Sequence, residues 1–385
     1  MSAQAIRFIG RGAKSVEDPL VTEGARVMGI CNACRYCEGY CAVFPAMERR
    51  LDFNRASLDY LANLCHHCGA CFYACQYAPP HAFAVNVPRT LAQLRTQSYT
   101  TYAWPRAFAA LYRRHGAAVS LALAAGLALF LVLALAFAPQ GLFAAYSGAS
   151  FYAVLPHGLM VAIFGATFAF AVLAITGGAV RYWRAIAGDA APPAGVPQAI
   201  RDALTLRNLD GGGDGCYVRE GFDDGPTHAR RWLHHFTFYG FLLCFAATCV
   251  ATVYHYALGL QAPYSFTSPP VVLGTLGGSG LLIGPAGLLW LKRGQDSRLR
   301  DPAMQPLDAG LLWLLLATSA TGLLLLALRA TSAMPLLLAL HLGCVLALFV
   351  ILPFGKFAHG VCRALALAKY HREARQPNPV VVSDS

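Results

Sequence analysis

The chain has 385 residues, of which 57% are hydrophobic and 13% are charged, and its formal net charge is +11. Ordinary soluble domains contain about 25% charged residues, so this composition indicates a membrane protein and argues against a soluble enzyme. The Lys and Arg residues lie mostly between apolar runs, which membrane topology explains better than nucleic-acid binding does.

The first part of the chain has soluble character and holds most of the cysteines. Residues 1–25 are expected to form a loosely ordered arm, followed by a domain over 26–116. The N-terminus, MSAQAIRFIG, lacks the apolar core of a secretory signal peptide. The eight cysteines within residues 31–75 are therefore expected to be reduced, cytoplasmic and available to bind metal.

These eight cysteines form two runs with one shared spacing, C-x2-C-x2-C-x3-C, which is typical of bacterial ferredoxins. In two-cluster ferredoxins the fourth cysteine of each run binds the other cluster. We therefore predict two [4Fe–4S] clusters, although a three-iron cluster stays open for one of them. Zinc sites use four ligands, usually in two pairs, and fit the pattern poorly. The predicted ligand sets are Cys31, Cys34, Cys37 and Cys75 for the first cluster, and Cys65, Cys68, Cys71 and Cys41 for the second.

The segment between the two runs favours a helical type of ferredoxin domain. Small ferredoxins have a proline directly after the fourth cysteine, whereas Ala42 and Gln76 stand at those positions here. The sequence RASLDYLANL, residues 55–64, has the apolar spacing of a helix. We expect an all-α, two-cluster domain similar to the helical ferredoxin domain of succinate dehydrogenase iron–sulfur subunits.

Six apolar runs follow, and each can supply the roughly 20 residues that a membrane-spanning helix needs. The fourth run is rich in glycine and proline, so a re-entrant segment is the alternative there. We predict a six-helix bundle with two helices, a loop over 181–233 and four further helices. The expected spans are 117–138, 157–180, 234–258, 270–291, 308–330 and 334–358.

The loops between these runs alternate in charge. The loops 139–156 and 259–269 carry no charge, whereas 181–233, 292–307 and the tail 359–385 carry Lys and Arg. The positive-inside rule then places both termini in the cytoplasm. The long loop 181–233 contains PPAGVP and LDGGGDG and is expected to be a flexible cytoplasmic insertion.

Two histidines of the last run predict haem. His341 lies well inside this run, and His359 follows 18 residues later. On one continuous helix that spacing is five turns, so both side chains would share a face, about 27 Å apart along the axis. Polar residues inside a bilayer are costly and usually functional. The spacing therefore suits two b-type haems, one near each membrane surface.

The third run offers partner histidines at matching depths. At the inner end, His235 is expected to share a haem with His359, and its neighbour His234 is a nearly equal choice. At the outer end, His255 is expected to share a haem with His341.

Other readings of the histidines stay open. His157 competes for the outer position, and histidines at the ends of spans also occur as ordinary residues at the headgroup level. His66 and His67 lie inside the second cysteine run and are predicted to tune the potential or solvent exposure of its cluster.

The sequence contains no nucleotide-binding signature. No G-x-G-x-x-G follows a strand pattern, and no Walker loop is present. No catalytic residue or substrate site is therefore assigned. Electrons would have to come from a dehydrogenase on the cytoplasmic side and leave to an acceptor in the lipid bilayer, for which quinone is the natural choice.

The stretches MGICNACRYCEGYC, LCHHCGACFYAC and RRWLHHFTFYGFLLCF resemble the tricarballylate-utilisation protein B family, also called citrate-utilisation protein B. The resemblance implies a bacterial-type inner-membrane iron–sulfur protein, with haem proposed. Such a protein reoxidises the flavin of a partner FAD-dependent dehydrogenase acting on tricarballylate and passes the electrons to the respiratory chain. The membrane part is similar to the γ subunit of respiratory nitrate reductase, whose last helix presents two haem-binding histidines. That likeness favours His341 and His359.

Two other classes of function were weighed against electron transfer. An iron–sulfur redox sensor or assembly protein would hold clusters without turnover, and it would not need histidines stacked across the bilayer. A tricarboxylate transporter binds its anion with cations inside the membrane. The interiors of the six runs contain no Lys or Arg, which argues against a transporter.

Overall fold

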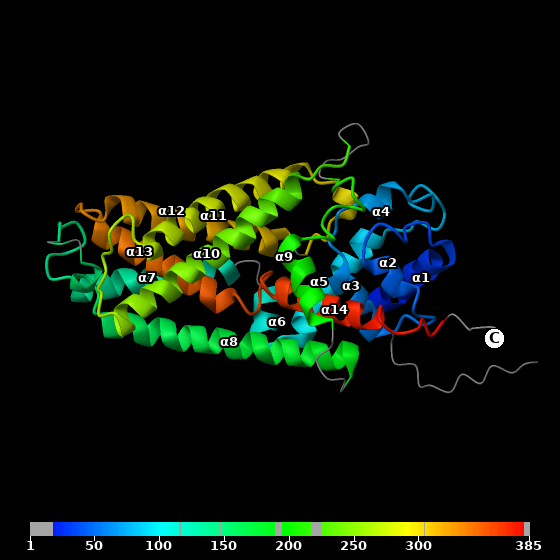
Figure 1. The fold of residues 1–385 in the computed structure, drawn as a ribbon, viewed down its shortest axis with the longest axis horizontal. Helices are drawn as coiled ribbons and strands as arrows, with labels where there is room; N and C mark the ends of the chain where they lie inside the picture. The colour runs from blue at the N-terminus through cyan, green and yellow to red at the C-terminus, as the bar shows by residue number, and fades with distance from the viewer. Residues whose placement is uncertain are drawn as a thin grey trace, which may run out of the picture.

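The computed structural model describes residues 18–114, 118–146, 148, 150–188, 195–217, 225–303 and 305–380. Over these residues the chain is helical apart from one isolated β-bridge between Cys216 and Thr227. This confirms the all-α fold predicted from the sequence. Figure 1 shows an elongated molecule with long helices at one end and the short helices of the cysteine-rich domain at the other.

The cysteine-rich domain begins earlier than the sequence suggested. Helix α1 starts at Pro19, where the carboxylate of Asp18 accepts a hydrogen bond from the backbone N–H of Leu20. The expected arm over 1–25 therefore ends at residue 18 or before, and residues 1–17 lie outside the described residues. The helices of this domain are α1 (Pro19–Cys34), α2 (Val43–Met47), α3 (Arg55–Leu64), α4 (Ala70–Tyr73) and α5 (Val87–Tyr102).

Helix α3 forms the centre of this domain, and it covers the helix predicted between the two cysteine runs. The side chain of Asn54 caps it by accepting a hydrogen bond from the backbone N–H of Ser57. Its apolar residues are removed from solvent, with Leu58, Leu61 and Leu64 each 0% exposed. Helix α3 therefore gives the segments that carry the cysteines a rigid surface to pack against.

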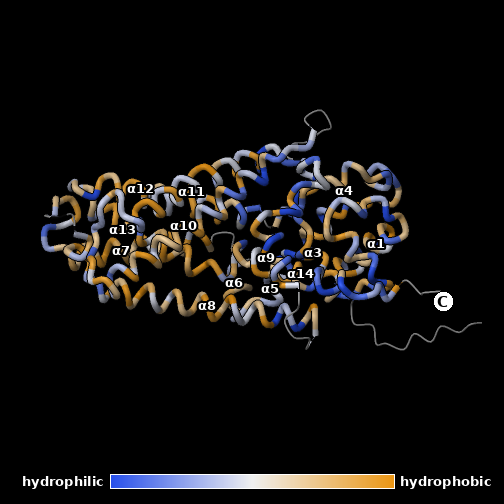
Figure 2. Tube along the Cα trace, viewed as in Figure 1, coloured by the Kyte–Doolittle hydropathy of each residue, from blue (hydrophilic) through white to orange (hydrophobic). Residues whose placement is uncertain are grey.

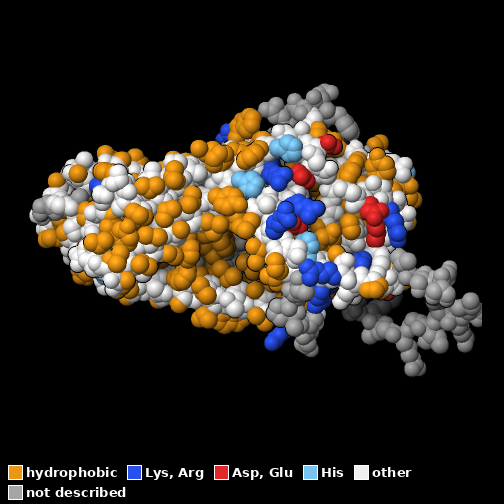
Figure 3. Space-filling view, viewed as in Figure 1, with side chains coloured by type: hydrophobic (Ala, Val, Ile, Leu, Met, Phe, Trp, Pro, Cys, Tyr) orange, Lys and Arg blue, Asp and Glu red, His pale blue; other side chains and the backbone are white. Residues whose placement is uncertain are grey.

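The membrane part contains six helices that are long and apolar enough to cross a bilayer. Figure 2 shows them as largely hydrophobic tubes, and Figure 3 shows hydrophobic side chains covering this end while Lys and Arg gather toward the cysteine-rich domain. The chain is thus a multi-pass membrane protein. These helices are α7 (Ala118–Phe137), α8 (His157–Ala187), α10 (Ala229–Ala257), α11 (Pro269–Gly294), α12 (Gln305–Leu328) and α13 (Met334–Ile351).

The fourth span is a full helix and not a re-entrant segment. Helix α11 runs for 26 residues and continues through Pro285. Its glycines let it lie directly against α10, because a Cβ atom added at Gly284 would sit only 2.4 Å from Oγ1 of Thr237. Close backbone approach through small residues is the usual way in which membrane helices associate.

The expected sixth span is divided into two helices. Helix α13 ends at Ile351, and α14 (Ala358–Glu373) begins only after a turn that contains Pro353 and Gly355. His341 and His359 therefore do not share one continuous helix, and the predicted five-turn register between them is wrong. Proline cannot continue the backbone ladder of a helix, and glycine weakens it, so both residues favour the break.

The loop over 181–233 is folded over most of its described residues. Helix α8 extends to Ala187, and α9 (Val196–Thr205) packs against α14. The prediction of a flexible insertion is wrong for the described part of this loop, whereas residues 189–194 and 218–224 lie outside that part. The remaining named helical segments among the described residues are α6 (Arg106–Arg114), η2 (Phe151–Ala153) and η3 (Ser297–Leu299).

Candidate metal centres

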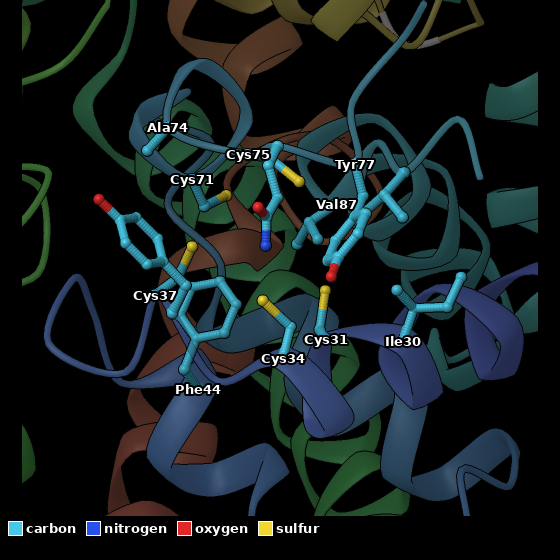
Figure 4. Close-up of a pocket in the computed structure, with 13 residues that line it drawn as sticks. Ile30, Cys31, Cys34, Cys37, Phe44, Cys71, Ala74, Cys75, Tyr77 and Val87 are labelled. Carbon is cyan, nitrogen blue, oxygen red and sulfur yellow. The ribbon is translucent and has the colours of Figure 1, made fainter. Parts of the chain in front are cut away.

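The first group of cysteines surrounds a cavity of about 260 Å³ between the end of α1 and the segment after α4. Arg35 caps α1 in a left-handed conformation, which turns the chain back directly after Cys34. Figure 4 shows the cysteine sulfurs of this cavity turned toward one another from both sides. The cysteines that line it are Cys31, Cys34, Cys37 and Cys75, which are the four predicted for the first cluster, together with Cys71.

The second group surrounds a smaller cavity on the other side of Cys71. Gly69 precedes α4 with a φ of 84°, which reverses the chain between Cys68 and Cys71. This cavity has a volume of only about 20 Å³, so its side chains have to rotate outward to admit a four-iron cluster. The cysteines that line it are Cys41, Cys65, Cys68 and Cys71, the four predicted for the second cluster.

The geometry of these thiols fits clusters better than single ions. A tetrahedral zinc site with 2.3 Å bonds needs sulfurs about 3.8 Å apart. Within the described residues, no three His, Cys, Asp or Glu side chains converge closely enough to hold one metal ion. An all-thiol donor set is otherwise typical of iron–sulfur clusters, which space their ligands more widely.

Two thiols of the first cavity, Cys31 and Cys37, are protonated when no metal is bound. Burial, reinforced by the neighbouring Cys75, raises the pKa of Cys31 and of Cys37 to about 12. The thiolate is the form that binds metal, so loading the site has to release these protons.

Three arginines, of which Arg95 is buried and the others are partly buried, surround the second group. Arg95 of α5 and Arg363 of α14 both donate to the backbone oxygen of Cys65, at 2.6 Å and 2.7 Å. Arg230 of α10 donates to the backbone oxygen of His67. In contrast, no Lys or Arg is among the described residues that line the first cavity. Positive charge near a cluster stabilises its reduced, more negative form.

The two histidines of the second run are held by backbone carbonyls. Nδ1 of His66 lies 2.9 Å from the backbone oxygen of Leu64, and Nε2 of His67 lies 2.6 Å from that of Leu299. Burial and nearby arginines lower the pKa of His66 well below its usual value and that of His67 to about 3. Both rings are therefore neutral, which suits a role in the cluster's surroundings.

The structure places one pair of membrane-edge histidines side by side. The ring centroids of His234 in α10 and His359 in α14 are 5.9 Å apart, with an angle of 79° between the ring planes. A metal held between two imidazoles by bonds of about 2.0 Å separates the ring centroids by about 6 Å. Nδ1 of His359 contacts the backbone oxygen of Lys356, which leaves Nε2 free for a metal.

The partner of His359 is His234 and not the preferred His235. His235 instead stacks on Tyr239, with ring centroids 5.6 Å apart. Consecutive residues on a helix point about 100° apart, so only one of these neighbours can face α14. The structure thus selects the alternative that the sequence left nearly equal.

The outer pair does not form. His255 stacks on His157 with ring centroids 4.1 Å apart, which is too close for an iron between them. His341 points toward α12 instead, where its Nδ1 lies 3.1 Å from the backbone oxygen of Thr318 and 3.2 Å from Oγ1 of Thr321. His157 thus takes the place beside His255 that was expected for His341.

Sequence reasoning missed the residue that connects the second cysteine group with the inner histidine pair. Arg363 follows His359 by one helical turn and donates to the backbone oxygens of Asn63 and Cys65. The only signal was an arginine four residues after a candidate ligand on an apolar helix. This spacing was informative only once α14 was known to enter the cysteine-rich domain.

A mostly buried carboxylate, Asp308, at the end of the membrane part nearest the cysteine-rich domain was also missed. Asp308 of α12 accepts hydrogen bonds at 2.9 Å from the ammonium groups of both Lys292 and Lys356. The three residues come from segments far apart in sequence, so no local pattern joins them. They tie the ends of α11 and α12 to the turn before α14.

Comparison with known proteins identifies the same two regions. A family model described as the Fer4-like domain of citrate utilization protein B matches residues 24–101, and a model described as citrate utilization protein B matches residues 110–380. A curated protein of Escherichia coli named citrate utilization protein B is 53% identical over 365 residues, which cover 94% of this chain and 95% of that protein. No solved structure matches.

Proposed function

Because the chain belongs to the citrate utilization protein B family, we propose that it carries electrons from a partner flavoprotein to quinone in the membrane. The Fer4-like domain supports iron–sulfur binding, and the six apolar helices support a place in the bilayer. The proposed partner is an FAD-dependent dehydrogenase of the tricarballylate type, at the cytoplasmic face of a bacterial-type inner membrane. Both termini lie on that face in this proposal.

The positions of the three candidate centres favour a direction for the electrons. The first cavity lies near the surface, where the adjoining Tyr36 is 68% exposed. The second group is enclosed by arginines, and the inner histidine pair lies one helical turn from Arg363. Electrons would enter at the first cluster, pass to the second and leave through a b-type haem held by His234 and His359.

The protein supplies positions and charge for this transfer. Two bound [4Fe–4S] clusters and a haem would act as one-electron carriers. Reduced flavin gives up two electrons, and quinone takes up two electrons with two protons. Positive charge from Arg95, Arg230 and Arg363 stabilises the reduced form of the second carrier. An electron therefore has a lower energy on the second cluster than on the first, which favours transfer in that direction.

One observation carries the proposal: Arg363 connects the second cysteine group to the pair His234 and His359. It donates to the backbone oxygen of Cys65 and lies one helical turn after His359. The test is a dithionite-reduced minus oxidised spectrum of the detergent-purified protein, with iron and pyridine-haemochrome assays on the same sample. We expect about eight non-haem irons, as two cubanes require, and b-type bands. His234→Ala and His359→Ala should each remove the inner haem, whereas the matched control His235→Ala should retain it.

Other results would change the proposal in defined ways. Clusters without haem would refute the histidine assignment, and quinone would then have to take electrons directly from a cluster. Absence of non-haem iron in wild-type protein would refute the whole path. Clusters and haem without quinone reduction by the reduced flavoprotein would favour a sensor or an assembly protein.

A further inference from the structure

A segment of the cytoplasmic loop covers the second cysteine group. Leu206, Leu209 and Cys216 form a small buried core, and Cys68 packs against it. Cys216 itself is 1% exposed. Cys216, which belongs to neither cysteine run, therefore lies beside a predicted cluster ligand.

The backbone fixes this segment at the turn that carries Cys68. The N–H of Tyr217 donates to the backbone oxygen of Cys68 at 2.9 Å, and the ring of Tyr217 stacks on Tyr73 with centroids 4.3 Å apart. Paired backbone hydrogen bonds of 2.9 Å join Cys216 to Thr227. The position of the Cys216 side chain is thus set by contacts on both sides of it.

The side chains of Cys216 and Cys68 pack together in this small core. Sγ of Cys216 also lies 3.8 Å from the backbone oxygen of Leu209, to which its S–H donates when no iron is bound. Once Cys68 binds iron it is a thiolate and has no proton to give. Only the S–H of Cys216 can then donate. Cys216 does not line the second cavity, so it lies behind Cys68 and not among the four thiols that surround the cluster position.

We propose that Cys216 donates its S–H to the Cys68 thiolate and thereby raises the reduction potential of the second cluster. Reduction adds negative charge that spreads onto the sulfur ligands, so a donor stabilises the reduced form more than the oxidised form. Cys216 acts through Cys68 and is a positioning residue. The inference rests on cluster binding by Cys68 within the proposed function, but not on flavin, haem or quinone.

The test is a redox titration of the purified full-length protein, followed by electron paramagnetic resonance. A Cys65→Ser variant identifies which signal belongs to the second cluster. In Cys216→Ala we expect the wild-type iron content and about a tenfold lower equilibrium constant for reducing that cluster, which corresponds to about 59 mV for one electron. Cys216→Ser retains a donor and should recover most of the difference, and the first cluster should not change.

A matched variant separates the hydrogen bond from packing. Leu209→Ala loosens the same small core but keeps the thiol donor. Added water near the cluster stabilises its more negative reduced form, so this variant should leave the potential unchanged or raise it. If Cys216 only fills space, its removal should leave the reduction potential of the second cluster unchanged or raise it. If Cys216 donates a hydrogen bond, its removal should lower that potential.

Three results would overturn the inference. The first is an unchanged or higher reduction potential of the second cluster in Cys216→Ala, and the second is a decrease in Cys216→Ser as large as that in Cys216→Ala. The third is loss of about four irons in Cys216→Ala, which would make Cys216 a ligand. If wild-type protein held no clusters, the proposed function itself would fail, and the iron assay on that protein shows this before any variant is compared.

Discussion

Removing the mostly buried carboxylate of Asp308 should strongly destabilise the end of the membrane part that adjoins the cysteine-rich domain. The side chain of Asp308 is only 13% exposed, and the ammonium groups of Lys292 and Lys356 each lie 2.9 Å from its Oδ2. Asp308→Asn keeps the shape but leaves two like charges close together without compensation. Breaking a buried ion pair in this way typically costs about 3–5 kcal/mol. The measurement is thermal unfolding of the detergent-solubilised protein.

Two matched variants make that prediction specific. Glu23→Gln removes one partner of an exposed pair with Arg26 and should cost less than about 1 kcal/mol, because solvent screens such pairs. Replacing both lysines with methionine in the Asp308→Asn background removes the uncompensated charges and should recover most of the lost stability. If the thermal-unfolding midpoint fell no further in Asp308→Asn than in Glu23→Gln, the reasoning would be refuted.

Three further predictions follow from the same structure. Cys34→Ser should remove one cluster, about four irons, and stop electron flow, whereas transfer at the wild-type rate would place that cluster off the path. Gly284→Ala should cost about 1–3 kcal/mol of stability, because the added Cβ would lie 2.4 Å from Oγ1 of Thr237. The control Gly165→Ala should cost nothing, because no atom lies within 4 Å of its added Cβ. Equal thermal-unfolding midpoints for the two variants would contradict this packing. Burial lowers the pKa of Lys369 in the folded protein to about 8. Above that pH the unfolded chain binds more protons at this lysine than the folded chain does. The contribution of Lys369 to the free energy of unfolding therefore rises from pH 8 to 10. Lys369→Met should therefore be more stable than wild type, by a larger margin at pH 7 than at pH 10. A difference in the free energy of unfolding that does not change with pH would refute this contribution from Lys369.

The sequence predicts best where the determinants are local. Apolar spacing identifies α3, and hydropathy identifies the six membrane helices found among the described residues. Cysteine spacing also predicts which thiols gather, since the two cavities are lined by the two expected sets. These features follow from neighbouring residues, so they do not depend on how distant helices pack.

The errors arise where distant segments decide the outcome. Hydropathy stays high from α13 through the turn that follows it, so the break at Pro353 and Gly355 was hidden inside the apolar run 334–358. The choice of His234 over His235 depends on where α14 lies relative to α10. The glycine-rich loop looked flexible because the pairing of Cys216 with Thr227 is invisible in composition.

The return of α14 into the cysteine-rich domain also sets an order for biogenesis. Arg363 and its hydrogen-bond acceptor at Cys65 are 298 residues apart, and all six membrane helices lie between them in the chain. Synthesis proceeds from the N-terminus, so the ribosome has to deliver every span to the membrane before α14 can dock. The cysteines of the second group are thus made early and enclosed late. A cell therefore has a period during translation and insertion in which the assembly machinery can reach these thiols before the final helix closes over them.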